Sequence, residues 1–280
     1  MATALSSISE VDRELALLRL DPESGEPFQR TSVMTHIAWV PSEWVEAAED
    51  VLSGLAERHP SRTIVLVPDT DAEDGLEAKV DLACYRAGEG RQVCVETIRL
   101  RLGGNRAEVP ASVVQPLLLP DLPVFLRWRG LPPFGERPFE ELLDVVDRLI
   151  VDSNEWPGLP APYEQFAEVF DRVAVSDIAW ARTSRWRPQL ASLWPGIKGV
   201  ERIKVTGTAA QANLLAGWLR SRLGHPVELE HEQSDRLVGV DVDGKPAPFP
   251  PGDAPNPADL LSDELETFGR DRVYEEAVRA

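Results

Sequence analysis

Tryptophan and arginine side chains are concentrated in one short segment, residues 177–187. This segment reads Asp-Ile-Ala-Trp-Ala-Arg-Thr-Ser-Arg-Trp-Arg and contains Trp180, Arg182, Trp186 and Arg187. Aromatic rings beside guanidinium groups are typical of interface hot spots and of sites that hold phosphates or sugars. The same residues also fit a structural role, in which Asp177 caps a helix, both tryptophans lie in the core and Arg182 pairs internally. The sequence leaves both interpretations open.

Two further places combine polar and aromatic residues at the expected ends of strands. Trp128 ends an apolar run and is flanked by Arg127 and Arg129, and strand alternation places the tryptophan and the arginines on opposite faces. Asp152 and Ser153 follow a second apolar run. Because ligands of α/β proteins bind beyond the carboxyl ends of the strands, Trp128, Asp152 and Ser153 join the candidates for partner or ligand binding.

Carboxylates are too abundant to identify a catalytic pair. Glu96, Asp121, Asp152 and Asp177 could serve as an acid and a base, but 47 Asp and Glu residues in 280 will place some acids together by chance. The chain has no Gly-x-Ser-x-Gly and no His-Glu-x-x-His, and the glycines at 103–104 lack the spacing of a phosphate loop. We therefore predict no catalytic residue and no cofactor.

The two cysteines, Cys84 and Cys94, lie in two predicted strands on either side of an Ala-Gly-Glu-Gly turn. They and the four histidines lack metal-ligand spacing, so we predict no metal site. Pairing of Cys84 with Val93 would place Cys94 on the opposite face, whereas a slip of one residue would bring the sulfurs together. Two buried free thiols and a reversible thiol switch are both compatible with the sequence.

Hydrophobic patterns predict the elements that position these residues. A β-rich run at 31–40, a helix with apolar residues at i, i+4, i+7 and i+11, and a strand at 63–67 form a parallel strand-helix-strand unit. Further predicted strands are 79–85, 91–100, 122–128, 148–151, 201–206, 227–232 and 236–242, and predicted helices are 11–20, 110–114, 139–146, 163–173, 184–194, 209–223 and 260–278. The prediction is an α/β fold with a mixed, mostly parallel sheet flanked by helices.

The pattern also divides the chain into four segments. We expect an N-terminal arm at 1–30, an α/β domain at 31–195, and a smaller strand-helix-strand-strand unit at 196–243. A Pro-rich linker and an amphipathic C-terminal helix then occupy 244–280. The helix could dock on a partner or fold back onto its own domain.

Charge and hydropathy limit the classes of partner. The formal net charge of −18 repels phosphate backbones and anionic lipid heads, so we predict neither nucleic-acid nor membrane binding. The chain has no run of about 18 uncharged apolar residues, and no basic stretch precedes an apolar core at the N-terminus. These features predict a cytoplasmic protein.

Seven ordered segments carry a resemblance to a known family. They are residues 59–64, 94–98, 116–124, 152–153, 177–187, 217–224 and the two parts of the terminal helix, Asp-Glu-Leu and Tyr-Glu-Glu-Ala. In this order they resemble the OpcA-type glucose-6-phosphate dehydrogenase assembly proteins, from about residue 30 to the C-terminus. That family occurs in cyanobacteria and actinobacteria, and we expect an actinobacterial source.

The resemblance implies a non-catalytic partner that binds glucose-6-phosphate dehydrogenase and promotes its assembly or active state. It would support the NADPH supply of the oxidative pentose phosphate pathway as an allosteric effector. Cysteines make some cyanobacterial members redox-responsive, and Cys84 and Cys94 are the residues here that could do so. The alternative is an enzyme or sensor that binds a phosphosugar near Trp128, Asp152 and Arg182.

Overall fold

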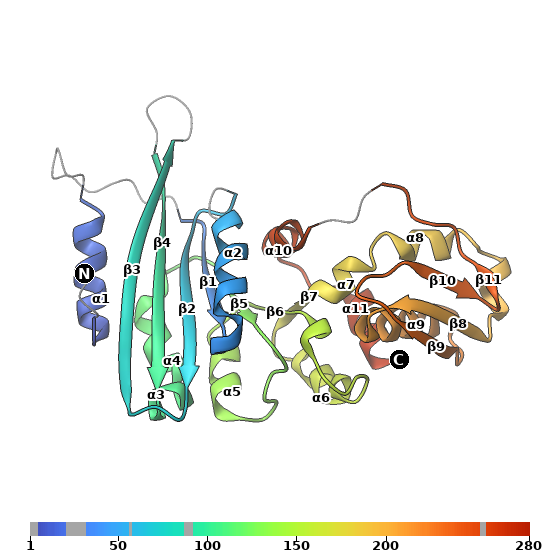
Figure 1. Ribbon diagram of the computed structural model, residues 1–280, viewed down its shortest axis with the longest axis horizontal. Coiled ribbons are helices and arrows are strands. Elements are labelled where there is room, and N and C mark those ends of the chain that lie inside the picture. The colour runs from blue at the N-terminus through green and yellow to red at the C-terminus, as the bar shows by residue number, and fades with distance from the viewer. Residues whose placement is uncertain (1–4, 21–31, 56–57, 87–91, 253–255) are drawn as a thin grey trace. The chain divides into compact units, whose positions relative to one another are not determined.

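The computed structural model describes residues 5–20, 32–55, 58–86, 92–252 and 256–280 (Figure 1). The chain forms two compact units, residues 1–149 and 150–280, and the boundary falls within one strand, β6 (Arg148–Val151). The four predicted segments were drawn from sequence pattern, and their boundaries stay predictions.

The larger sheet has seven strands in the order β3-β4-β2-β1-β5-β6-β7. The strands of the first unit are β1 (Met34–Trp39), β2 (Ser61–Asp69), β3 (Gly75–Arg86), β4 (Gln92–Gly103) and β5 (Val124–Trp128), with β7 (Ala174–Asp177) in the second unit. Strand β1 pairs in parallel with β2 and β5, β2 pairs in parallel with β4, and β3 is antiparallel to β4. The prediction of a mixed, mostly parallel sheet is confirmed.

Helices cover both faces of this sheet in the first unit. They are α1 (Ile8–Leu18), η1 (Ser42–Trp44), α2 (Val45–Leu55), α3 (Asn105–Glu108), α4 (Pro110–Val114), η2 (Gln115–Leu117) and α5 (Arg137–Leu143). On one face, Ala48 of α2 packs with Ala38, Val40 and Val65 in a buried cluster. Since side chains alternate along a strand, the even-numbered residues of β2 lie on the opposite face from Val65, where Arg62 donates to the carbonyl of Leu117 in η2.

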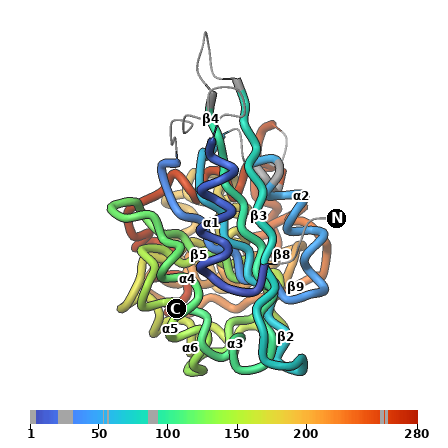
Figure 2. Tube along the Cα trace, turned by 90° about the vertical axis from the view of Figure 1, so that its left-hand side faces the viewer, coloured from blue at the N-terminus to red at the C-terminus, as the bar shows by residue number. Residues whose placement is uncertain are grey.

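The N-terminal arm docks on its own unit. Helix α1 is capped by Ser7, and its buried residues Val11 and Leu15 face β3, against which Figure 2 shows the helix lying. Arg19 donates to Glu96 of β4 at 2.5 Å, and Glu96 also accepts from Arg62 of β2 at 2.8 Å. Burial by itself would raise the pKa of Glu96, but the two guanidinium groups lower it overall, so Glu96 is a structural carboxylate.

The second unit contains a separate four-stranded sheet in the order β11-β10-β8-β9. Its strands are β8 (Arg202–Gly207), β9 (Glu228–Gln233), β10 (Gly239–Val242) and β11 (Lys245–Pro246), and helix α9 (Ala209–Leu223) packs on β8 and β9. Thr208 and Gln211 form a capping box at the start of α9, and Gly224 ends the helix in the left-handed conformation. The sequence predicted this strand-helix-strand-strand order.

The other elements of the second unit depart more from expectation. They are η3 (Ser153–Glu155), α6 (Pro162–Val169), α7 (Ile178–Arg182), α8 (Trp186–Ala191), η4 (Gly196–Gly199), α10 (Pro257–Leu265) and α11 (Arg272–Arg279). The sequence did not predict β7 or α7. The single terminal helix predicted at 260–278 is wrong, because the chain leaves the helical path after α10 and Asp271 caps a new helix, α11.

Candidate functional site

A buried polar cluster in the second unit surrounds Asp177. This residue ends β7 and is the N-cap of α7, so its side chain points back over the first turn. Its Oδ1 accepts from the amides of Ser153 at 3.0 Å and Ala179 at 2.8 Å. Its Oδ2 accepts from the Ser153 hydroxyl at 2.6 Å and the Tyr274 hydroxyl at 3.0 Å. Four donors therefore occupy the carboxylate, two on each oxygen.

Burial controls the protonation of this cluster. Burial raises the pKa of Asp177 to about 6, and the charge of Asp152 acts in the same direction, while hydrogen bonds from Ser153 and Ala179 oppose the rise. Burial also raises the pKa of Tyr163 and of Tyr274 well above 10, so both phenols stay protonated donors. Tyr163 donates to the Ser153 hydroxyl at 2.9 Å, which extends the network.

Asp152 and Arg182 form a second part of the cluster. The Nη1 group of Arg182 donates to both oxygens of Asp152, at 3.0 and 2.8 Å. Asp152 also caps η3 by accepting from the amide and the side chain of Asn154. The side-chain oxygen of Asn154 accepts from Thr208, which connects this cluster to the capping box of α9. Arg182 thus pairs internally, as one of the two interpretations that the sequence left open would have it.

Trp180 holds the terminal helix. Its indole Nε1 donates to Asp271 at 2.8 Å, and its ring packs against Tyr274 with the ring centroids 5.6 Å apart. The guanidinium carbon of Arg187 lies 3.6 Å from the centroid of the Trp180 ring, a cation–π contact. Burial lowers the pKa of Arg187 to about 10, but the group remains charged at neutral pH. The segment that we proposed for contact thus fastens α11 onto its own unit.

The other two candidate tryptophans lie in the core. Trp186 is 5% exposed and packs edge-on against Phe249. In the first unit, Trp128 is 2% exposed and stacks on Trp39, with centroids 4.6 Å apart, and its ring also meets the edge of Phe139. Of the two interpretations offered by the sequence, the structural one describes where these rings lie.

The structure joins the two cysteines in a disulfide between β3 and β4. Cys84 and Cys94 are directly opposite in the strand register, with Cα atoms 4.1 Å apart. Cys94 is buried, whereas Cys84 is exposed. Of the two interpretations that the sequence left open, that of two buried free thiols is wrong, because the observed register brings the sulfurs onto the same face of the hairpin.

Other sequence candidates serve local structure. The glycines at 103–104 lead into Asn105, whose backbone and side-chain amides both donate to Asp74. A carboxylate thus occupies the amide that a phosphate loop would present. Within the described residues, no group of three or more His, Cys, Asp or Glu could hold a metal ion. No helix among the described residues has the length and apolar character needed to cross a membrane.

The sequence did not indicate which distant residues complete the cluster. The sequence offered no reason to choose Tyr163, Tyr274 or Asp271 as candidates. Tyr274, for example, lies 97 positions along the chain from Asp177, the carboxylate to which it donates. The family resemblance included Tyr274 in its last segment, and this was the only signal that pointed to it. The structure brings Asp152, Ser153, Asp177, Trp180, Arg182 and Arg187 together in the second unit.

Comparison with known proteins assigns the family. Residues 53–169 match the family described as the N-terminal domain of the glucose-6-phosphate dehydrogenase subunit, and residues 173–249 match its C-terminal domain. A relative from Synechococcus elongatus, named "Putative OxPP cycle protein OpcA", is 27% identical over 224 residues, which are 70% of this chain and 50% of the relative. The relative of the same name from Nostoc punctiforme is 28% identical over 194 residues, with 65% and 42% covered.

A third protein of that name, from Synechocystis, is 27% identical over 181 residues, or 60% of this chain and 38% of the relative. All three relatives are cyanobacterial, so the actinobacterial source stays a prediction. This chain spans half or less of the length of the relatives it matches. The two domain matches together cover more than half of the chain, and the protein belongs to the OpcA family of glucose-6-phosphate dehydrogenase assembly proteins.

Proposed function

We propose that this protein is a non-catalytic partner that binds glucose-6-phosphate dehydrogenase and promotes its assembly or active state. The matched family is described as a subunit of glucose-6-phosphate dehydrogenase, which supports this enzyme as the binding partner. The name of the relatives points to the oxidative pentose phosphate cycle. As an allosteric effector, the protein would bind one state of the enzyme more tightly and shift the equilibrium by that difference in affinity. Its action would take place in the cytoplasm.

The proposal that the protein is non-catalytic rests on Asp177, because hydrogen-bond donors of its own unit use the acceptor positions of its carboxylate. A buried carboxylate with a raised pKa is a common general base, and Asp177 has both properties. A general base also needs a lone pair within reach of its substrate. The two oxygens of Asp177 have about four acceptor positions, and four donors of the same unit use them. The arrangement suits a carboxylate that fastens three segments together.

The phosphosugar-binding alternative gains no such support. Trp128 is closed within an aromatic stack of the first unit, so its ring offers little surface to a sugar. Asp152 and Arg182 neutralise each other through two hydrogen bonds. We therefore do not propose a phosphosugar site at these residues.

We propose that charged side chains with partial exposure to solvent contact the dehydrogenase. Trp180, Trp186 and Asp177 are each at most 5% exposed, so they cannot present much area to a partner. Arg182 and Arg187 are half-buried. Since arginine is enriched at interface hot spots, we propose that these two guanidinium groups contribute to contact and that the buried residues position them.

The test combines the purified protein with glucose-6-phosphate dehydrogenase of the same organism. We expect a complex heavier than either protein in light scattering, together with a lower apparent KM or a larger enzyme oligomer. Arg187→Ala is expected to weaken binding at least about fivefold, since truncation of a hot spot exceeds about 1 kcal/mol. The exposed Arg236, changed to Ala, is the matched control and should bind as the wild type does. Unchanged mass and kinetics at micromolar concentrations would refute the proposal.

We also propose that the Cys84–Cys94 disulfide responds to the thiol redox state. Exposed Cys84 is accessible to an attacking thiolate, which would form a mixed disulfide there and release Cys94 as a thiolate. A second thiol of the reductant then frees Cys84, so that the reductant leaves oxidised.

The redox proposal predicts a loss of stability on reduction. The crosslinked residues are 10 positions apart, and chain entropy predicts that reduction lowers the free energy of unfolding by about 2–3 kcal/mol. Urea unfolding with and without a dithiol measures this, alongside the effect on the dehydrogenase. Cys94→Ser should remove both responses, and a variant that still responds would exclude the disulfide as the switch.

A further inference from the structure

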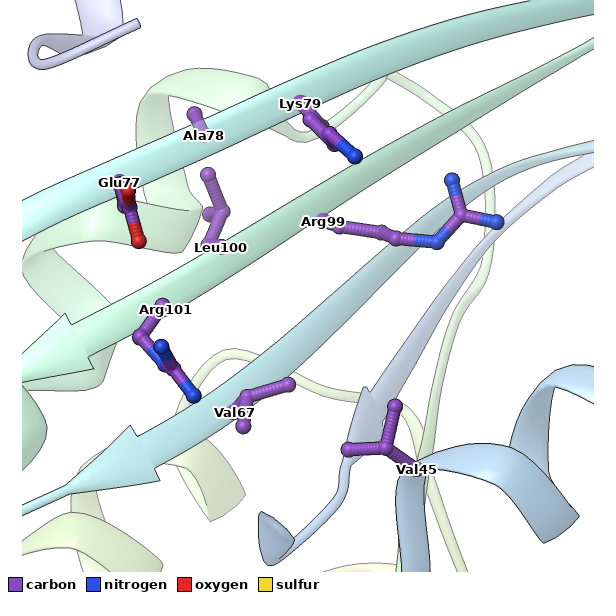
Figure 3. A pocket seen from close by; sticks show the side chains of 8 residues that line it. All are labelled: Val45, Val67, Glu77, Ala78, Lys79, Arg99, Leu100 and Arg101. Carbon is purple, nitrogen blue, oxygen red and sulfur yellow. The ribbon is translucent and has the colours of Figure 1, made fainter. Parts of the chain in front are cut away.

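A groove lies on the α2 side of the β3–β4 hairpin, wholly within the first unit (Figure 3). Its volume is about 380 Å³. The walls include Glu77 and Lys79 of β3, Arg99 and Arg101 of β4, and the apolar side chains Val67 of β2 and Val45 of α2. This volume lies within the range of about 300–1,000 Å³ that is typical of small-molecule sites.

Strand alternation and helix placement together create the groove. Glu77, Lys79, Arg99 and Arg101 lie at alternate positions of their strands, so they share one face of the sheet. Helix α2 packs its apolar side over β1 and β2, in the cluster around Val65. The neighbouring part of the same face, formed by β3 and β4, remains open beside the helix.

The cations of this face repel one another. Lys79 is directly opposite Arg99 in the strand register, and Arg101 is the next residue of β4 on the same face. Figure 3 shows the side chains of Lys79, Arg99 and Arg101 lining the groove together with the two valines. Like charges directly opposite on a sheet are destabilising, and an anion among them would remove this repulsion.

Two of these cations lack a carboxylate partner. Arg99 pairs with Glu49 at 2.8 Å and with Asp81. The side chains of Lys79 and Arg101 form no ion pair or hydrogen bond with any residue that the structure describes, although Glu77 is opposite Arg101 in the register. The chain has 47 acidic and 29 basic residues, so carboxylates are in excess. Despite this excess, the donors of two neighbouring cations in one groove are left for an anion from outside the protein.

We propose that this groove binds a small organic phosphate. Lys79 and Arg101 hold the phosphate oxygens, because guanidinium and ammonium groups form short, charge-assisted hydrogen bonds with phosphate. Val45 and Val67 contact the carbon part of the ligand, and Glu77 accepts from a hydroxyl group. Polymeric nucleic acid is a poor occupant, because the net charge of −18 repels a long phosphate backbone.

Calorimetry on the isolated protein tests this site with three probes: inorganic phosphate, glucose 6-phosphate and glucose. We expect saturable binding of glucose 6-phosphate, weaker binding of inorganic phosphate and none of glucose. Arg101→Ala and Lys79→Ala should each weaken the binding of glucose 6-phosphate at least about tenfold. Both side chains are exposed, so the variants should fold, which circular dichroism checks.

The control is Arg236→Ala, which removes an exposed arginine of the other unit and should change affinity less than twofold. An equal loss in this control would show that general charge, and not the groove, attracts the anion. Absence of saturable binding, or unchanged affinity in Arg101→Ala, would overturn the proposal. Inorganic phosphate binding as tightly as the ester would overturn the role of the valines. No dehydrogenase is present, so the result is independent of the proposed function.

Discussion

Replacement of Gly217 by alanine is expected to detach the C-terminal helix from its own unit. Gly217 lies in α9, where α11 packs closely, and an added Cβ would lie 2.0 Å from the carbonyl oxygen of Ala277. Real Cβ atoms do not approach a backbone oxygen so closely, so α11 must move. The movement would expose Tyr274, which is fully buried, and break its hydrogen bond to Asp177.

The sign of this effect is diagnostic. In a helix interior, Gly→Ala ordinarily stabilises by about 0.5–1 kcal/mol because glycine loses more backbone entropy. Here we expect a loss of about 2–3 kcal/mol from overpacking and lost burial. Hydrogen exchange followed by mass spectrometry should show protection of residues 272–279 falling about 30-fold or more.

The matched control for this prediction is Gly199→Ala. A Cβ at Gly199 would meet nothing within 4 Å, and this glycine has no positive φ, so exchange in α11 should stay as in the wild type. Unchanged or increased protection in Gly217→Ala would show that α9 and α11 can separate without loss. Release of α11 with tighter dehydrogenase binding would instead make the helix a partner-docking element, as its amphipathic sequence first suggested.

Removal of the Asp177 carboxylate is expected to have the other large effect. Asp177→Ala would leave the amides of Ser153 and Ala179 and the hydroxyls of Ser153 and Tyr274 without their acceptor in a buried site. Unsatisfied buried donors cost about 1–3 kcal/mol each, and partial rearrangement reduces the sum to about 3–5 kcal/mol. Urea unfolding measures the loss. The exposed Asp235, changed to Ala, should stay within about 0.5 kcal/mol of wild type.

Asp177 should also make stability depend on pH. Its pKa rises from 3.8 to about 6 in the folded protein, so folding favours the protonated form. This contribution is fully present below about pH 4 and is lost as the pH rises through about 6. The difference of about two pKa units corresponds to about 3 kcal/mol.

The isosteric variant Asp177→Asn isolates this titration. Relative to the variant, the wild type should lose up to about 3 kcal/mol of stability between pH 4 and pH 7, because only the wild type ionises at this position. Urea unfolding of both proteins across this range gives the difference directly. If the stability difference between the two proteins does not change with pH, the pKa of Asp177 is not raised. If the wild type gains stability as the pH rises, the four hydrogen-bond donors lower the pKa of Asp177.

Much of the fold could be predicted from the sequence because its signals are local. Apolar periodicity located α2 and α9, and the Gly-containing turn predicted the β3–β4 hairpin. Strand β7 was missed because its four residues, Ala-Val-Ser-Asp, do not form an apolar run, whereas the equally short β6 contains Leu-Ile-Val. The tail was predicted as one helix, since an apolar stripe continues across the break at residues 266–271 between α10 and α11. Local pattern does not reveal where a cap interrupts such a stripe.

The candidate site was predicted in part. The sequence singled out Asp152, Ser153 and Asp177, and the structure brings all three together: Ser153 donates to Asp177, and the charge of Asp152 acts on Asp177. It did not predict Tyr274, because a contact across 97 positions depends on how α11 packs. The groove beside the hairpin was also missed, since charges at alternate positions of a strand look like an ordinary solvated face.

The sequence by itself determined the family, the order of most elements and the alternation that sets which residues share a strand face. Only the tertiary structure decided whether the tryptophans and arginines of residues 177–187 meet solvent or their own core, because the same aromatic and guanidinium groups pack well in either place. It placed Trp180 against α11 and Trp186 against Phe249. Register, which shifts side chains between faces with one residue of slip, likewise decided that Cys84 and Cys94 form a disulfide.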